Sequence, residues 1–317
     1  YFSTHVIKPL PVKTIISGSV LNPLNDSVKV YNDKGVFLSK LNYNNRFKML
    51  LDIDSSAYFS FFHGVETTAM YVNPGDNIEL TIDTEAFDET INYRNSEEST
   101  FLSQKYLITE NQLDKSKNIY NLSDSLFNTL LDNFKFKISQ ELMKISNAEF
   151  VALEEEGIVN TLNFYRNRKL TLDNLPKIGA PASDFTYPNQ YGDNVSLLDF
   201  KGKYVYVDVW ATWCGPCIYQ IPFLVELEKE YYDRDIVFLS VSIDDDKDRE
   251  KWRDMLVEKN MGGTQLFASG GSEITQDYAI FSIPRFMLFD REGNVLDLYA
   301  PKPSQADEIR AVLEDLF

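Results

Sequence analysis

The spacing of hydrophobic and polar positions changes twice along the chain, which divides it into three regions. Up to about residue 95, short runs rich in Val, Ile, Phe and Tyr alternate with turn sequences such as Asn73-Pro74-Gly75-Asp76. Runs of this kind, bounded by Asn, Pro, Gly and Asp, are typical of short strands. Residues 1–95 are therefore predicted to form a β-sandwich-like domain.

Residues 96–175 are predicted to form a helical region. Apolar residues between Leu126 and Ile145 recur at spacings of three and four, and Ser123 is a candidate N-cap for this helix. A second helical stretch begins at Asn147, and residues 167–176 are expected to close the region as a linker. We interpret the apolar stripe as core packing rather than as a ligand groove.

Strands and helices alternate in residues 176–317. A hairpin is predicted at 185–197, with Gly192-Asp193-Asn194 as its turn. Strands are predicted at 204–210, 236–243, 286–290 and 295–299, and helices at 217–231, 246–259 and 304–316. This alternation predicts an α/β domain in which a mixed sheet is flanked by helices.

Composition and charge narrow the possible partners. The 317 residues are 44% hydrophobic and 25% charged, which is typical of globular domains, and the net charge is −17. Such a surface repels phosphate backbones, so nucleic acid is not expected as a partner. No apolar run is long enough to span a membrane. The chain begins at Tyr1 rather than Met, which we interpret as a trimmed or mature form with any signal peptide out of view.

The chain has two cysteines, Cys214 and Cys217, and they form one C-x-x-C sequence. A pair this close is either half of a metal site or a redox couple. A zinc site would need both histidines, His5 and His63, to converge on the pair from distant parts of the chain. We therefore favour the redox couple and expect neither a metal nor another cofactor.

The cysteine pair directly follows the predicted strand 204–210 and opens the next helix. Backbone N–H groups and the helix dipole favour negative charge at a helix N-terminus, so we expect the thiolate form of Cys214 to be stabilised. The thiolate is the nucleophile of thiol–disulfide exchange. Cys217, one turn later, can attack the resulting mixed disulfide and release the substrate.

Residues 207–217, Val-Asp-Val-Trp-Ala-Thr-Trp-Cys-Gly-Pro-Cys, resemble thioredoxin and, more closely, its TlpA/ResA-like branch. Ile178-Gly179-Ala180-Pro181 resembles the extra N-terminal hairpin of that branch, and Ser282-Ile283-Pro284 resembles the segment that holds its cis-proline. The resemblance covers about residues 178–317. It implies a thioredoxin-like fold for the C-terminal domain and the activity of a thiol–disulfide oxidoreductase.

The resemblance also implies a substrate-binding surface around the cysteines. Pro284 would be the cis-proline opposite them. The backbone of Ile283 would pair with an extended substrate segment, as in strand addition. Trp213 would form part of the exposed apolar surface around Cys214.

Asp208 is predicted to accept the proton of Cys217. In the strand 204–210 it shares one face with Tyr206 and Trp210, and a central strand of this kind is buried on both faces. A buried carboxyl group has a raised pKa and can accept a proton directly or through water. Thioredoxin has an aspartate here, whereas many TlpA/ResA-like proteins place a glutamate where this chain has Gln220, which cannot titrate. The alternative is a buried aspartate with a purely structural role.

Two further classes of function are possible. The extra hairpin is shared with peroxiredoxin-like peroxidases, but these need a Pro and a Ser or Thr where this chain has Val207 and Ala211. A client-binding or scaffold protein of the cell envelope, with an accessory redox domain, remains the alternative. In that case the first 175 residues would do the main work, since their β region resembles modules ahead of envelope thioredoxins.

Two other motifs are predicted to be structural. The acidic run 244–248 lacks the glycine and the distal glutamate of a calcium loop, so we expect a solvated loop with acidic N-capping residues. Gly262-Gly263 does not follow a strand with a phosphate-binding spacing, so we interpret the pair as loop glycines.

The direction of the reaction and the location follow from the resemblance. The Gly-Pro dipeptide between the cysteines resembles thioredoxin, so a reductase is favoured over an oxidase. The expected partners are protein disulfide substrates and a thiol–disulfide electron donor. The TlpA/ResA-like branch works outside the cytoplasm, so we expect the periplasm or cell envelope, with any lipid anchor or membrane tether outside this chain. The cytoplasm is less favoured, and the sequence gives no oligomeric state.

Overall fold

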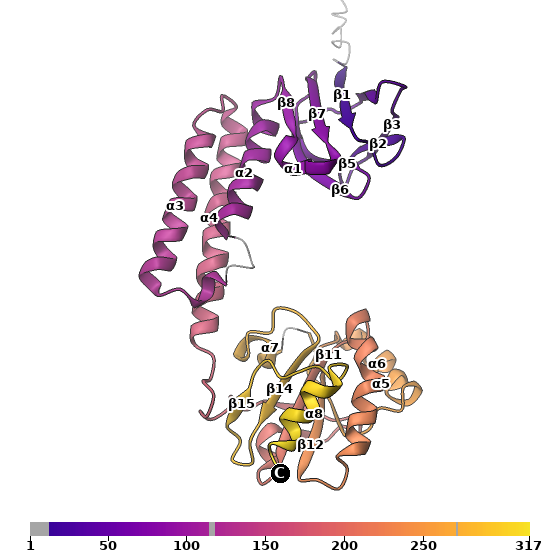
Figure 1. Cartoon of the computed structure of the whole chain (residues 1–317), viewed down its shortest axis with the longest axis vertical. Helices are drawn as coiled ribbons and strands as arrows, with labels where there is room; N and C mark the ends of the chain where they lie inside the picture. Colours follow the sequence, from indigo (N-terminus) through magenta and orange to yellow (C-terminus); the bar gives the residue numbers. More distant parts are fainter. Residues whose placement is uncertain (1–12, 114–117, 271) are drawn as a thin grey trace, which may run out of the picture. The chain divides into compact units, whose positions relative to one another are not determined.

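A computed structural model describes residues 13–113, 118–270 and 272–317 of the chain (Figure 1). The chain divides into two compact units, of which the first ends at Arg166 and the second begins at Asn167. The boundaries predicted near residues 95 and 175 remain predictions. Each unit is described by itself.

Two four-stranded sheets form the β-sandwich of the first unit, as the sequence predicts. One sheet has the order β4-β1-β7-β8 and the other the order β3-β2-β5-β6. Strands β1 and β7 pair in parallel, and the other pairs are antiparallel. Alternate side chains point into a shared core, which includes Ile16, Val30, Phe61 and Leu80. The strands are β1 (Thr14–Leu21), β2 (Ser27–Tyr31), β3 (Val36–Lys40), β4 (Arg46–Leu51), β5 (Ala57–His63), β6 (Glu66–Val72), β7 (Asn77–Asp83) and β8 (Asn92–Arg94).

Within its described residues, the predicted helical region contains three long helices, α2 (Glu97–Leu113), α3 (Asp124–Leu142) and α4 (Ala148–Asp173), while the short α1 (Phe87–Thr90) precedes β8. Helix α2 packs against both α3 and β6. Phe127, Leu131, Phe134 and Ile138 of α3 are buried, which confirms that the apolar stripe is core.

Helix α4 continues through residues 167–173, where the sequence predicts a linker, so that prediction is wrong over these residues. The segment contains Arg, Lys and Leu, which favour helix. Lys169 also pairs with Asp173 one turn later, at 2.9 Å between Nζ and Oδ2. The helix ends three residues before Pro176, which would interrupt it.

The second unit is built on a five-stranded mixed sheet in the order β13-β12-β11-β14-β15. The central strand β11 runs parallel to β12 and antiparallel to β14. All of its residues after the first are buried, as predicted for a strand covered on both faces. The strands are β11 (Tyr204–Trp210), β12 (Ile236–Ser242), β13 (Thr264–Phe267), β14 (Arg285–Phe289) and β15 (Val295–Asp297).

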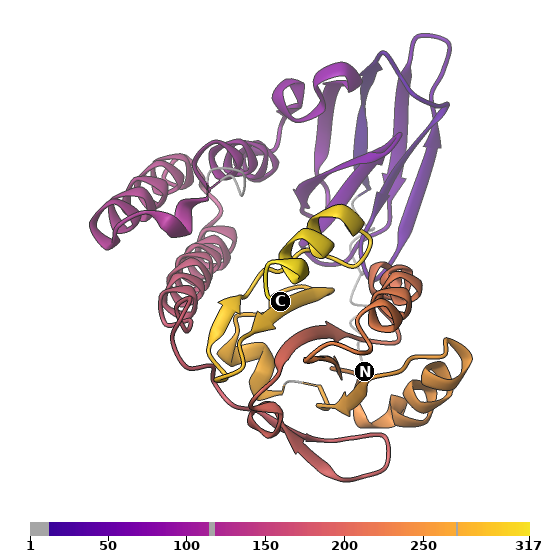
Figure 2. The ribbon, with the colours of Figure 1, turned by 60° about the horizontal axis from the view of Figure 1, so that its bottom comes forward.

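Helices cover both faces of this sheet, which confirms the predicted α/β domain (Figure 2). The face of Tyr206 and Trp210 is covered by α5 (Gly215–Glu230), α6 (Arg249–Glu258) and α8 (Ala306–Glu314). The face of Val205 and Val207 is covered by α7 (Glu273–Asp277) and by the predicted hairpin, β9 (Thr186–Pro188) and β10 (Asn194–Ser196). Along the chain, α5 is the first helix after the central strand β11.

Within the described residues, no helix offers an apolar stretch that could span a bilayer.

Candidate active site

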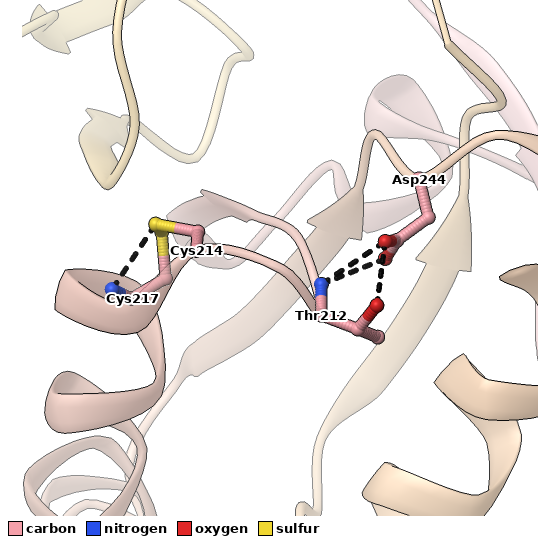
Figure 3. The surroundings of a disulfide bond; sticks show 4 residues. All are labelled: Thr212, Cys214, Cys217 and Asp244. Atoms are coloured by element: carbon pink, nitrogen blue, oxygen red, sulfur yellow. Dashed lines mark hydrogen bonds between the residues drawn. A yellow bond between two sulfur atoms is a disulfide. The ribbon is translucent and has the colours of Figure 1, made fainter. Parts of the chain in front are cut away.

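Cys214 and Cys217 are joined by a disulfide bond at the start of α5 (Figure 3). Cys214 is the N-cap residue of the helix, and the Cys217 N–H donates to Cys214 Sγ at 3.2 Å. Both cysteines are almost fully buried, with exposed fractions of 5% and 2%. The first turn of α5 therefore directs a backbone donor at the Cys214 sulfur, as the sequence predicts.

A cavity of about 450 Å³ opens beside Cys214 and brings together most of the predicted substrate-binding residues. Its walls are Trp213, Cys214, Gly215, Pro216, Ile243 and residues 280–283. Trp213 is 62% exposed, so the cavity has an apolar rim. Ile283 lies in the wall, and the Ile283–Pro284 peptide bond is cis, as the resemblance implies.

Asp208 lies on β11 between Tyr206 and Trp210, on the face that α5 covers. Its side chain is 4% exposed. Burial raises the pKa of Asp208 to about 7 in the disulfide form, although a hydrogen bond from Ser240 acts in the opposite direction. The carboxyl group is thus poised to exchange a proton near neutral pH.

Gln220 occupies a structural position on α5. It is buried, and its Oε1 accepts the backbone N–H of Ser304 at 3.0 Å. The side chain therefore holds the segment ahead of α8.

Asp244 belongs to the active-site region around Cys214, although the sequence predicts a solvated loop for residues 244–248. Asp244 is fully buried, so the prediction is wrong for this residue. Its carboxyl group accepts the Thr212 N–H at 3.0 Å and the hydroxyl groups of Thr212 and Ser242 at 2.7 Å each (Figure 3). These bonds fix the segment two residues before Cys214.

The predicted acidic residues do occupy N-cap positions in this loop, but they do not cap through their side chains. These residues are Asp245 and Asp248, and neither side chain makes a capping hydrogen bond. A signal for Asp244 was present in the sequence, because it continues the alternate positions of Ser240 and Ser242 directly after β12, a strand that is buried on both faces.

Replacing Asp244 by asparagine is expected to lower the free energy of unfolding by about 2 kcal/mol, because an amide NH₂ would then face donors that bond to a carboxylate. Denaturation in urea measures the loss. The matched control is Asp245→Asn, an exposed neighbour whose ion pair with Lys247 contributes little. Equal stability of the Asp244→Asn variant and the unaltered protein would show that the network does not hold the segment.

Of the two histidines that a metal site would need, His63 is buried in the sandwich of the first unit. Its Nε2 accepts the Leu24 N–H at 3.0 Å, and its Nδ1 lies 2.9 Å from the Ser27 carbonyl oxygen. His5 lies outside the described residues. Among the residues that the structure describes, no three His, Cys, Asp or Glu side chains gather in a way that could hold a metal ion.

This geometry defines a class of protein: a dithiol–disulfide pair at the start of a helix, directly after the central strand of a thioredoxin-like sheet. Comparison with known proteins agrees. The Redoxin family model matches residues 177–313. The chain is 28% identical over 126 residues to the thiol–disulfide oxidoreductase ResA of Bacillus thuringiensis subsp. konkukian, covering 40% of this chain and 71% of the relative.

Two further proteins match this chain. The thioredoxin-like protein YneN of Bacillus subtilis is 31% identical over 121 residues, which cover 38% of this chain and 70% of the relative. The solved thioredoxin domain of a thiol–disulfide oxidoreductase from Bacteroides vulgatus is 26% identical, with a TM-score of 0.39, and the match covers 44% of this chain and 96% of that domain.

The chain belongs to the TlpA/ResA-like family of thioredoxin-like proteins. It is a thiol–disulfide oxidoreductase.

Proposed function

We propose that this protein reduces protein disulfides through the Cys214–Cys217 dithiol. The observation that supports the proposal is the position of Cys214, which caps α5 and lines a cavity with an apolar rim. A disulfide flanked by apolar residues can enter this cavity, where Trp213 and Ile283 would contact it. The backbone of Ile283, before the cis-proline Pro284, would pair with the client segment.

The reaction consists of two exchanges. The Cys214 thiolate attacks one sulfur of the client disulfide, which releases one client thiol and forms a mixed disulfide. Cys217 then loses its proton to Asp208 and attacks the Cys214 sulfur, which releases the second client thiol and closes the Cys214–Cys217 disulfide. The client gains two electrons, and a thiol–disulfide electron donor returns two electrons to the protein.

The proposed location is the periplasm or cell envelope. Its support is the family to which the chain belongs, together with the resemblance of its first region to modules found ahead of envelope thioredoxins. A lipid anchor or membrane tether would lie outside residues 1–317.

The Cys217→Ser variant tests the roles of the two cysteines. When the reduced variant is mixed with insulin, we expect a stable mixed disulfide between Cys214 and one insulin cysteine, because no second thiol can resolve it. Electrophoresis without reductant, followed by mass spectrometry of the adduct, detects it. Cys214→Ser is the matched control and should form no adduct. An adduct through Cys217 in the control, with none through Cys214, would reverse the assigned roles.

A further inference from the structure

The proposed proton acceptor has no direct path to solvent, because Asp208 is 4% exposed. A small cavity of about 10 Å³ lies on the same face of the sheet. Among the residues that line it are Ser240, Gln265 and Glu228, together with apolar residues such as Phe238. This volume is the space open to the centre of a water molecule, and it is about what one water molecule needs.

A polar row leads across the sheet from Asp208 to this cavity. In the strand register, Asp208 lies opposite Ser240, and Ser240 lies opposite Gln265. Side chains that are paired in register point to the same face, so the row crosses β11, β12 and β13 side by side. Hydrogen bonding from the Ser240 side chain lowers the pKa of Asp208, in opposition to the larger effect of burial.

Gln265 brings an unused acceptor to the cavity. The residue is 3% exposed, and its Nε2 donates to the Gly262 carbonyl at 2.6 Å. Among the described residues, its Oε1 has no hydrogen-bond partner. A buried carbonyl oxygen without a partner costs free energy unless water reaches it, so the arrangement suits a bridging water molecule.

Glu228 of α5 lies at the outer side of the cavity, and the loop glycines leave space for its carboxyl group. A Cβ atom at position 262 would lie 2.7 and 2.8 Å from the two carboxyl oxygens of Glu228, so only glycine fits there without displacing them. Burial raises the pKa of Glu228, while hydrogen bonding from the Gly263 backbone and the charge of Lys229 act in the opposite direction.

We infer that the proton of Asp208 reaches solvent through the Ser240 hydroxyl, one water molecule beside Gln265 and the carboxyl group of Glu228. The inference rests on the proposed role of Asp208. In the resolving step Cys217 gives its proton to Asp208, Ser240 takes this proton and passes its own to the water, and the water protonates Glu228. Glu228 releases the proton to solvent, and the departing client thiolate takes one from solvent, so the protons balance. Tyr206 and Ser240 face Asp208 within the sheet, and Lys229 adjoins Glu228.

The test is the rate of the resolving step in the reduced chain of residues 1–317, measured by acid quench after mixing with a disulfide peptide. For Glu228→Gln, which keeps the size of the side chain and the acceptor for Gly263, we expect this rate to fall about tenfold with a larger solvent deuterium isotope effect. The rate of mixed-disulfide formation should not change. Glu226→Gln, on the exposed side of the same helix, is the matched control and should behave like the unaltered protein.

A second variant keeps the test valid if Glu228→Gln fails to fold. Gly262→Ala displaces the carboxyl group and should slow the same step. An unchanged resolving rate in the folded Glu228 and Gly262 variants, with a slow Asp208→Asn variant, would overturn the relay and leave the proposed function intact. An unchanged rate in Asp208→Asn would instead overturn the role of Asp208 and the relay with it.

Discussion

Replacing Cys214 by serine is expected to lower the turnover of insulin disulfides by about 10³-fold or more, because a neutral hydroxyl replaces the thiolate that makes the first attack. Loss of an essential nucleophile removes the whole covalent pathway rather than one contribution to it. The measurement is the rate of insulin precipitation with dithiothreitol as electron donor, after subtraction of the rate without protein.

The contrast with Cys217→Ser separates chemistry from folding. Both variants lack the same disulfide bond, so any effect of its loss on stability is common to them. Only Cys217→Ser should still show one rapid attack on the client, whereas both should lose continuous turnover. Continued turnover by Cys214→Ser would contradict the proposed mechanism, because Cys217 is then the only cysteine in the chain.

The redox domain could be predicted from the sequence because its signals are local. The strand predicted at 204–210 has the bounds of β11, and the helix predicted at 217–231 overlaps α5 (Gly215–Glu230). A run of apolar residues followed by C-x-x-C places the strand, the helix start and both cysteines together. The cis bond before Pro284 and the burial of Asp208 followed from the resemblance and from the period of two in the strand.

The other parts of the site depend on contacts between distant residues. Asp244 is followed by exposed acidic residues, and its burial is decided by Thr212, which lies 32 positions earlier. The position of Gln265 beside Ser240 depends on the pairing of β12 with β13, a strand that the sequence did not predict. In the first unit, short β-favouring runs predicted a sandwich, but not that β1 pairs in parallel with β7 some 60 residues later. Local patterns give element type, whereas register and sheet order come from packing.

The polar row also explains two features that look structural when considered alone. Gly262-Gly263 has the composition of an ordinary loop, yet the pair is closely packed against a carboxyl group of the active-site helix. Ser240 looks like an ordinary strand residue, yet it lies opposite Asp208 in the strand register and lowers the pKa of that carboxyl group. In the proposed relay both features serve Asp208, and this carboxyl group should make opposite contributions to stability and to catalysis.

Replacing Asp208 by asparagine is therefore expected to slow the resolving step by about 100-fold, because the amide cannot accept the proton of Cys217.

The same change should stabilise the oxidised protein above neutral pH. The folded-state pKa of about 7 lies above the ordinary value of 3.8, so the unfolded chain loses this proton more readily. The contribution of Asp208 to the free energy of unfolding is fully present below about pH 4 and is lost as the pH rises to about 7. Above that pH it does not change further.

The size of the stability change follows from the same shift. A difference of about three pKa units corresponds to on the order of 4 kcal/mol, so Asp208→Asn should exceed the unaltered oxidised protein by up to this amount at about pH 8. Its amide oxygen can still accept a hydrogen bond from the Ser240 side chain, so that donor keeps a partner. Urea denaturation across this pH range measures the difference, with Asp233→Asn at an exposed position as control. A variant that is less stable at about pH 8 yet resolves the mixed disulfide at the unaltered rate would assign Asp208 a structural role, because a buried carboxylate kept for catalysis must cost stability where it is ionised.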